Sequence, residues 1–263
     1  MNFNSSTQAK ITWCPGCTNS AILIAFRQAV SELVEEQKVE LKNVVILSGI
    51  GCHGKITDYV NFNSFTSLHG RLVPTMTGVK IGNPSLSVFG FSGDGDTFDE
   101  GVAHLAHAAR RNSDINLFIH NNQLFALTTG QATALSPKGF KGRSTPEGNL
   151  EEPFNPLLFV LGAGASFVAR TYALDIPGTK DIMKKAAEHK GFSFVEIVQP
   201  CITFFDTREA LKDKRYFLDE TYPTNNLSIA LEKVQEQGEK IPFGIFYENQ
   251  RPSFEELLHN GLK

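Results

Sequence analysis

The sequence lacks any large excess of charge. Lys and Arg number 25 and Asp and Glu number 28 among 263 residues, which leaves a formal net charge of −3. Proteins that bind nucleic acid or anionic membrane surfaces usually carry a marked positive excess. We therefore expect neither nucleic acid nor a membrane surface as a partner.

The sequence also lacks a hydrophobic run that could span a bilayer. Its longest apolar run starts at residues 157–160 and soon meets Gly162 and Gly164, well short of the ~20 residues that a spanning helix needs. The first ten residues, MNFNSSTQAK, are polar and contain no apolar core of a signal peptide. A cytoplasmic location is the expectation.

Cysteine is scarce, with four residues at positions 14, 17, 52 and 201. In a reducing cytoplasm, cysteines serve metal binding or redox chemistry more often than structural disulfides. Cys14 and Cys17 form a Cys-Pro-Gly-Cys motif before a helical pattern, as in a thioredoxin-type redox site. That site needs a buried strand leading into the motif, and the polar residues 4–10 supply none, so disulfide exchange is disfavoured.

The chain is long enough, and at 41% hydrophobic residues apolar enough, to bury one substantial core. Strand-like runs alternate with helical patterns up to residue 201, which predicts an α/β fold: a three-layer α/β/α domain with a mainly parallel sheet. We predict this domain over residues 1–204. Residues 205–263 are charged and interrupted by prolines, and we predict an extension that packs on the domain or on a partner subunit.

A strand–helix–strand unit over residues 86–127 organises the chain. Residues 86–91 form an apolar run that ends in Ser-Gly, and residues 115–119 form a second run that ends in His-Asn-Asn. Between them, apolar residues at i, i+3, i+4 and i+7 predict a helix from Asp99 onward. The two strands should be parallel, so Asp94 and Asn122 follow their carboxyl ends, where open α/β sheets bind ligands.

Asp94 and Asn122 together indicate a magnesium site. One carboxylate and one amide oxygen are hard ligands, and Mg²⁺ commonly completes such a small set with water and phosphate oxygens. The alternative is that Gly93-Asp94-Gly95 is a plain turn, which is the usual place of an Asp between glycines.

The cysteines are expected at the same edge of the sheet. Cys52 follows a strand predicted at residues 44–47, and Cys201 follows one predicted at residues 192–198. With the CxxC pair they form four thiols, which suit zinc or an iron–sulfur cluster. Structural zinc sites usually combine two local pairs, whereas this set has one pair and two single residues. The alternative is that Cys52 and Cys201 are ordinary buried side chains.

These features together resemble a known family. Gly93-Asp94-Gly95, followed 28 positions after Asp94 by Asn122, resembles the thiamine diphosphate signature. The flanking residues and the cysteine set resemble the thiamine-binding beta subunits of 2-oxoacid:ferredoxin oxidoreductases over nearly the whole chain. The resemblance implies a thiamine diphosphate-binding fold with thiamine diphosphate, Mg²⁺ and a [4Fe–4S] cluster as cofactors.

The resemblance also implies roles for single residues. Mg²⁺ would be bound by Asp94, Asn122 and the backbone carbonyl of Leu124, Lys55 would bind the 2-oxoacid carboxylate, and His69 would lie close to the cofactor. The cluster ligands would be Cys14, Cys17, Cys52 and Cys201. The other cofactor-binding residues would be Ile50, Gly51, Cys52, His53, Gly93, Gly95, Asp96, Ala126 and Leu127.

The implied reaction is the oxidative decarboxylation of a 2-oxoacid, of the pyruvate or 2-oxoglutarate type, to acyl-CoA and CO₂. Electrons would pass through the cluster to ferredoxin, and coenzyme A would take the acyl group. Only the diphosphate-binding half of a thiamine enzyme is recognisable, so an alpha subunit would supply the pyrimidine-binding domain. Residues 128–153 show neither helical nor strand periodicity and are predicted to be a lid or a partner contact.

Two other functions are compatible with the residues alone. One is a thiamine-dependent decarboxylase or synthase subunit without redox chemistry, in which the cysteines are incidental. The other is a non-catalytic zinc-binding scaffold. Iron content separates the oxidoreductase from both, and Mg²⁺-dependent binding of thiamine diphosphate separates the scaffold from the two enzymes.

Overall fold

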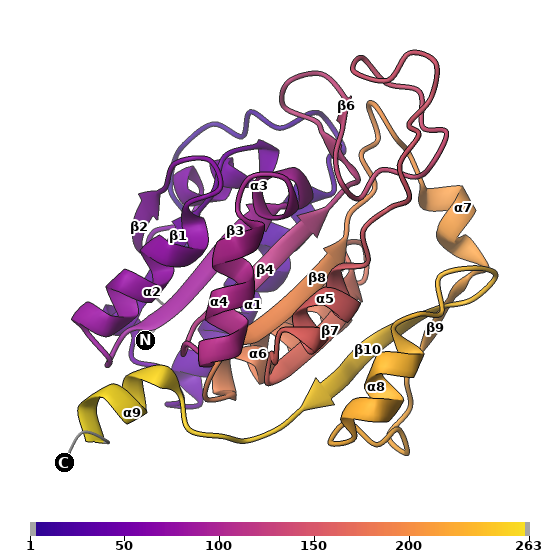
Figure 1. The fold of residues 1–263 in the computed structure, drawn as a ribbon. Helices are drawn as coiled ribbons and strands as arrows, with labels where there is room; N and C mark the ends of the chain where they lie inside the picture. Colours follow the sequence, from indigo (N-terminus) through magenta and orange to yellow (C-terminus); the bar gives the residue numbers. More distant parts are fainter. Residues whose placement is uncertain (1–3, 261–263) are drawn as a thin grey trace.

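The computed structural model describes residues 4–260, and its centre is an eight-stranded sheet with the order β2-β1-β3-β4-β8-β7-β10-β9 (Figure 1). All neighbouring strands are parallel except β7 and β10. The strands are β1 (Val44–Ser48), β2 (Asn63–Thr66), β3 (Ser87–Gly93), β4 (Asn116–Asn121), β7 (Phe167–Tyr172), β8 (Ser193–Val198), β9 (Arg215–Phe217) and β10 (Ile241–Glu248).

Helices cover both faces of this sheet. The helices are α1 (Asn19–Glu35), α2 (Leu72–Gly82), α3 (Asp94–Phe98), α4 (Val102–Arg111), α5 (Pro156–Gly162), α6 (Ile176–Glu188), α7 (Arg208–Lys212), α8 (Leu227–Lys233) and α9 (Phe254–Asn260). Helices α1 and α6 pack on one face, and α2, α4, α5 and α8 pack on the other. None of the helices in the described part of the chain is long and apolar enough to cross a bilayer.

Strand β4 shows why this sequence forms three layers. Its Phe118 packs into the apolar cluster under α1 and α6, whereas Leu117 and Ile119 belong to the cluster on the other face. Because successive side chains of a strand point to opposite faces, an uninterrupted apolar strand must be covered on both sides. The predicted three-layer fold with a mainly parallel sheet is confirmed.

The prediction of one helix from Asp99 onward is wrong at its start. The structure has two helices, α3 and α4, and Asp94 is the first residue of α3. Between them the chain passes close to the backbone of Gly70, since a Cβ on Gly101 would lie 3.1 Å from the Gly70 carbonyl oxygen. The helical spacing after residue 101 identified α4, but it contained no sign of the separate turn of helix at residues 94–98.

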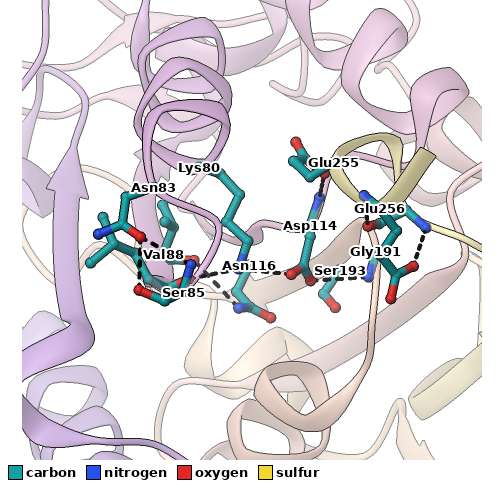
Figure 2. Close-up of polar contacts among 12 residues, drawn as sticks. Lys80, Asn83, Ser85, Val88, Asp114, Asn116, Gly191, Ser193, Glu255 and Glu256 are labelled. Atoms are coloured by element: carbon teal, nitrogen blue, oxygen red, sulfur yellow. Dashed lines mark hydrogen bonds and ion pairs between the residues drawn. The ribbon is translucent and has the colours of Figure 1, made fainter. Parts of the chain in front are cut away.

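The residues after 204 add strands to the sheet. β10 pairs antiparallel with β7, and β9 pairs parallel with β10. The chain then crosses to the amino ends of the parallel strands, where Glu255 of α9 accepts a hydrogen bond from the Asp114 backbone (2.8 Å) and Lys80 forms an ion pair with Asp114 (2.7 Å; Figure 2). The boundary predicted at residue 204 therefore falls within a chain that forms one sheet.

Candidate active site

A cavity of about 100 Å³ lies at the carboxyl ends of β1, β3 and β4. Its lining contains every residue that the resemblance assigned to thiamine diphosphate or Mg²⁺, together with Phe125 and Thr128, which were not predicted. The lining residues are Ile50, Gly51, Cys52, His53, His69, Gly93, Asp94, Gly95, Asp96, Asn122, Leu124, Phe125, Ala126, Leu127 and Thr128.

Asp94 is the buried carboxylate of this cavity, with 1% of the residue exposed. One carboxylate oxygen accepts a hydrogen bond from the Thr133 hydroxyl (2.6 Å), and the other accepts one from the Asn122 backbone (3.4 Å). Burial raises the pKa of Asp94 to about 7, and these hydrogen bonds oppose that rise. No Lys, Arg or His among residues 4–260 forms an ion pair with Asp94, so the chemistry of the site fits a bound cation.

The turn after β4 supplies the other oxygens expected to bind Mg²⁺. The Asn122 side-chain oxygen accepts a hydrogen bond from the Leu124 backbone (3.2 Å), and its amide group donates one to Gln199 (3.4 Å). The Ser136 hydroxyl donates to the carbonyl of Gln123 in the same turn (2.5 Å). Asn122 and Leu124 are thereby fixed next to Asp94, at the sheet edge where the parallel strands place them.

Asp96 fixes the loop that carries His69. One of its oxygens lies 2.8 Å from Nδ1 of the His69 ring and accepts a hydrogen bond from the Gly70 backbone (2.8 Å), and the other accepts one from Ser92 (2.7 Å). Both carboxylate oxygens are thus engaged by protein donors. Asp96 lines the cavity, and its visible effect is to hold His69 at the cavity wall.

Packing explains the glycines of this site. A Cβ on Gly95 would lie 2.3 Å from the ring of Phe125, and Cβ atoms on Gly51 and Gly93 would lie 2.6 and 2.8 Å from the ring of His53. Gly93-Asp94-Gly95 therefore does more than turn the chain, because both glycines admit a neighbouring ring. His53 is neutral at physiological pH, since burial lowers its pKa to about 4.

Residues on either side of the CxxC pair form hydrogen bonds with the segments that contain Cys52 and Cys201. The indole of Trp13 donates to the carbonyl of Cys52 (2.6 Å), and the hydroxyl of Thr18 donates to the carbonyl of Pro200 (3.0 Å). The pKa of Cys52 is raised to about 11, first by burial and then by the neighbouring thiols, which are Cys17, Cys201 and Cys14. Cys52 therefore lies within electrostatic range of the other three thiols.

Four thiols are a donor set whose chemistry fits either zinc or an iron–sulfur cluster. Within residues 4–260, no group of three or more His, Cys, Asp or Glu side chains is placed so that it could hold a metal ion. A single zinc ion draws four sulfurs to about 2.3 Å from one point. A [4Fe–4S] cluster binds each thiolate through a different iron atom, so it accepts a wider set of four cysteines.

Lys55 lies beside the cysteines and outside the cavity lining. It is half-buried on the short 3₁₀ helix Cys52–Asp58, and its ammonium group donates to the Thr12 hydroxyl (3.0 Å) and carbonyl (3.4 Å). Its positive charge acts against the rise in the Cys52 pKa. Its assignment to the 2-oxoacid carboxylate stays a prediction.

Sequence reasoning missed the donors that hold Asp94 from the segment 128–153. This segment includes β6 (Gln131–Ala132), which forms a hairpin with β5 (Leu124–Phe125). It places the Thr133 hydroxyl on Asp94 and the Ala134 backbone N–H on Asp99 (3.1 Å). Its many Ser, Thr and Gly residues are typical of any loop, so no local pattern indicated which hydroxyl reaches the site.

Two models of known families match the part of the chain that holds the cavity residues and Cys201. A family model described as the C-terminal TPP binding domain of thiamine pyrophosphate enzymes matches residues 49–197. A second model, described as the C-terminal part of the pyruvate ferredoxin oxidoreductase beta subunit, matches residues 201–261. The first span contains the cavity residues from Ile50 to Thr128, and the second begins at Cys201.

Individual relatives agree with these matches. The 2-oxoacid:ferredoxin oxidoreductase subunit beta of a Sulfolobus species is 40% identical over 263 residues, which cover 94% of this chain and 85% of that protein. The 2-oxoglutarate synthase subunit KorB of Archaeoglobus fulgidus is 38% identical over 239 residues, which cover 87% of this chain and 88% of that protein.

A solved structure shares the fold. The 2-oxoglutarate:ferredoxin oxidoreductase of Magnetococcus marinus, with 2-oxoglutarate, coenzyme A and succinyl-CoA bound, is 32% identical with a TM-score of 0.92. The match covers 97% of this chain and 87% of that one. The chain therefore belongs to the family of 2-oxoacid:ferredoxin oxidoreductase beta subunits, and its central part is a thiamine diphosphate-binding domain.

Proposed function

We propose that this chain, with an alpha subunit, oxidatively decarboxylates a 2-oxoacid of the pyruvate or 2-oxoglutarate type to acyl-CoA and CO₂ and passes the electrons through a [4Fe–4S] cluster to ferredoxin. The observation that carries the proposal is the position of Cys52, which lines the cavity of Asp94 and also belongs to the four-cysteine set. A cofactor in the cavity would therefore lie next to the electron acceptor. The cytoplasm, where thiols stay reduced, is the proposed location.

The residues of the cavity would bind and orient the cofactor. Asp94, Asn122 and the carbonyl of Leu124 would hold Mg²⁺, and the glycines on either side of Asp94 leave room for the diphosphate. Thiamine diphosphate, when bound, would supply the electron sink for decarboxylation, and the four cysteines would hold a cluster that accepts single electrons. Lys55 would exchange its contact with Thr12 for the carboxylate of the 2-oxoacid, and His69 would stay fixed by Asp96.

The wall of the cavity supports the need for an alpha subunit. Ile50 and Leu127 line it and are 37% and 47% exposed. Leu68, next to the lining residue His69, is 76% exposed, and Phe65 of β2 is 56% exposed. Large apolar side chains exposed around one site mark a surface that another chain covers. The alpha subunit would close the cavity there and contribute the pyrimidine-binding domain. Coenzyme A and the 2-oxoacid would enter the assembled complex, as both are bound in the related Magnetococcus marinus structure.

The test is the content of iron, acid-labile sulfide and zinc in the complex of both subunits, purified without oxygen and reconstituted with iron and sulfide. Four irons and four sulfides per chain, lost in Cys201→Ser, would support the oxidoreductase. One zinc and no iron would contradict it. Mg²⁺-dependent binding of thiamine diphosphate would then distinguish a non-redox thiamine enzyme from a zinc-binding scaffold.

A further inference from the structure

Two buried histidines, His53 and His120, lie close together at the cofactor cavity. His53 lines the cavity, His120 lies behind it on β4, and their ring centroids are 5.8 Å apart. His120 is 1% exposed, and its Nε2 has no hydrogen-bond partner among residues 4–260. His120 has no role in the proposed reaction. Its only side-chain hydrogen bond within residues 4–260 is made by its other ring nitrogen, Nδ1.

The Nδ1 atom of His120 lies 2.7 Å from the side-chain oxygen of Asn19. An amide oxygen can only accept, so Nδ1 carries the proton and donates it. Asn19 is the first residue of α1, directly after the CxxC loop, and is 1% exposed. The bond from His120 therefore fixes which way the buried amide of Asn19 points.

With its oxygen directed at His120, the Asn19 amide directs its NH₂ group at the cysteine set. The Asn19 nitrogen donates to the sulfur of Cys17 at 3.5 Å. The two neighbours agree on this orientation when Cys17 is a cluster ligand, because a ligating thiolate sulfur accepts and does not donate. The chain His120–Asn19–Cys17 is thus a directed hydrogen-bond path from the strand that carries Asn122 to one thiol of the cysteine set.

A hydrogen bond to a ligand sulfur changes the redox properties of an iron–sulfur cluster. It stabilises the state with more negative charge on the sulfurs, which is the reduced state, and so raises the reduction potential. We propose that Asn19, oriented by His120, is a positioning residue that raises the reduction potential of a cluster bound through Cys17. The inference rests on the proposed function, and only one electron moves in the step that it concerns, with no bond made or broken.

The test is the midpoint potential of the cluster, measured by electron paramagnetic resonance in a redox titration of the complex. Asn19→Leu removes the donor, and Asn19→Asp replaces it with an acceptor that still receives the bond from His120. Both should keep the wild-type iron content and shift the equilibrium toward the oxidised cluster by up to tenfold, which is about 59 mV for one electron. The shift should be toward more negative potential.

Two further variants control this test. Asn116→Leu removes another buried amide, at the opposite end of β4 and bonded to the carbonyl of Val88, and should leave the potential unchanged. His120→Phe leaves the Asn19 amide in place but frees its orientation, and should shift the potential in the same direction by less. If Asn19→Leu prevents cluster assembly, His120→Phe still tests whether the orientation of the Asn19 amide affects the potential.

The outcomes separate the inference from the proposed function. A wild-type complex without iron after reconstitution would contradict both. Iron-loaded Asn19 and His120 variants with wild-type midpoints would contradict the inference alone. The same shift in Asn116→Leu would also contradict it, because loss of any buried amide would then be sufficient.

Discussion

At the scale of single residues, Asp94 combines deep burial with the absence of any ion-pair partner in residues 4–260. Asp94→Asn keeps the shape of the side chain and removes its charge. We expect Mg²⁺-dependent affinity for thiamine diphosphate to fall at least about 100-fold, because even the residues that support metal ligands cost 10–100-fold when replaced. Titration calorimetry of the complex with the cofactor and Mg²⁺ measures this.

The free energy of unfolding supplies the second readout for Asp94. Without ligands, Asp94→Asn should be at least as stable as the wild type, since it removes a costly buried carboxylate. Asp99→Asn is the matched control, because Asp99 bonds the Ala134 backbone nearby and does not line the cavity. Equal cofactor affinity in Asp94→Asn and Asp99→Asn would contradict the role of Asp94.

The close packing of Gly95 against the Phe125 ring leads to a second prediction. A methyl group at this position would lie 2.3 Å from the ring of Phe125, which must then move together with the turn that carries Leu124. We expect Gly95→Ala to lower cofactor affinity about tenfold, since ligand placement tolerates little displacement. Equilibrium titration with thiamine diphosphate checks it.

Gly78→Ala provides the control for a glycine replacement. Gly78 lies inside α2, and a Cβ there would have no heavy atom within 4 Å. This variant should raise the free energy of unfolding by about 0.5–1 kcal/mol through helix propensity and leave cofactor affinity unchanged. Wild-type affinity in Gly95→Ala would show that the Phe125 loop yields without disturbing the site.

At the scale of elements, α9 is fastened to the amino edge of the sheet through Glu255. The residue is 2% exposed, one carboxylate oxygen accepts from the Asp114 backbone, and the other has no partner among the described residues (Figure 2). Burial raises the pKa of Glu255; the charge of Asp114 adds to the rise, and that of Lys80 opposes it. The charged form is therefore the unfavourable one in the folded state.

The pH dependence of stability follows from that direction. Because the folded pKa of Glu255 is above the unfolded one, protonation favours folding, and this contribution is lost as pH rises through the folded pKa. Glu255→Gln removes the dependence. The stability of the wild type relative to Glu255→Gln should fall as pH increases across that window and stay constant above it, as measured by urea unfolding at several pH values.

The control for this pH dependence lies in the same helix. Glu256→Gln changes a carboxylate that accepts a hydrogen bond from the Ser253 backbone (2.8 Å). Glu256 is exposed, so folding does not remove its carboxylate from water. A pH-independent difference between the wild type and Glu255→Gln would contradict the prediction.

The elements also show what local sequence could and could not predict. Periodicity and the rule for parallel strands predicted β1, β3, β4 and β8 and placed Asp94 and Asn122 at one edge, because those features depend on neighbouring residues. The pairing of β10 with β7 and the contact of Thr133 with Asp94 join residues far apart in the chain. No pattern near either partner specifies such contacts.

The cysteine set lies between these two cases. The positions of Cys52 and Cys201 after strands predicted that they share an edge with the CxxC pair. In the structure both residues follow strands, β1 and β8, and Cys52 lies within electrostatic range of the other three thiols. The amide of Asn19 beside Cys17 was not predicted, because an Asn at the start of a helix is most often a cap. Its actual partner, His120, lies 101 positions later in the sequence.

At the scale of the whole molecule, the surface divides into two ends. The carboxyl edge of the parallel strands holds the cavity, whose lining includes the exposed apolar side chains of Ile50 and Leu127. The amino edge is closed by the chain's own C-terminal helix and its polar contacts. A partner subunit should therefore bind over the carboxyl edge.

Leu68→Asp tests this surface. Leu68 is 76% exposed beside His69, so an aspartate costs the isolated chain little stability but would bury a charge under a partner. We expect the affinity for the alpha subunit to fall about tenfold or more, as for a central interface residue. The dissociation constant, measured by light scattering or surface binding, and the thermal unfolding of the isolated chain give the two readouts.

Leu257→Asp is the matched control for this substitution, because Leu257 is 52% exposed on α9 at the opposite end of the molecule. It should leave association unchanged. If Leu68→Asp and Leu257→Asp weaken binding equally, the partner does not bind over the cavity. If the isolated wild-type chain decarboxylates 2-oxoacids at the full rate of the complex, the cavity needs no second subunit, and its exposed leucines require another explanation.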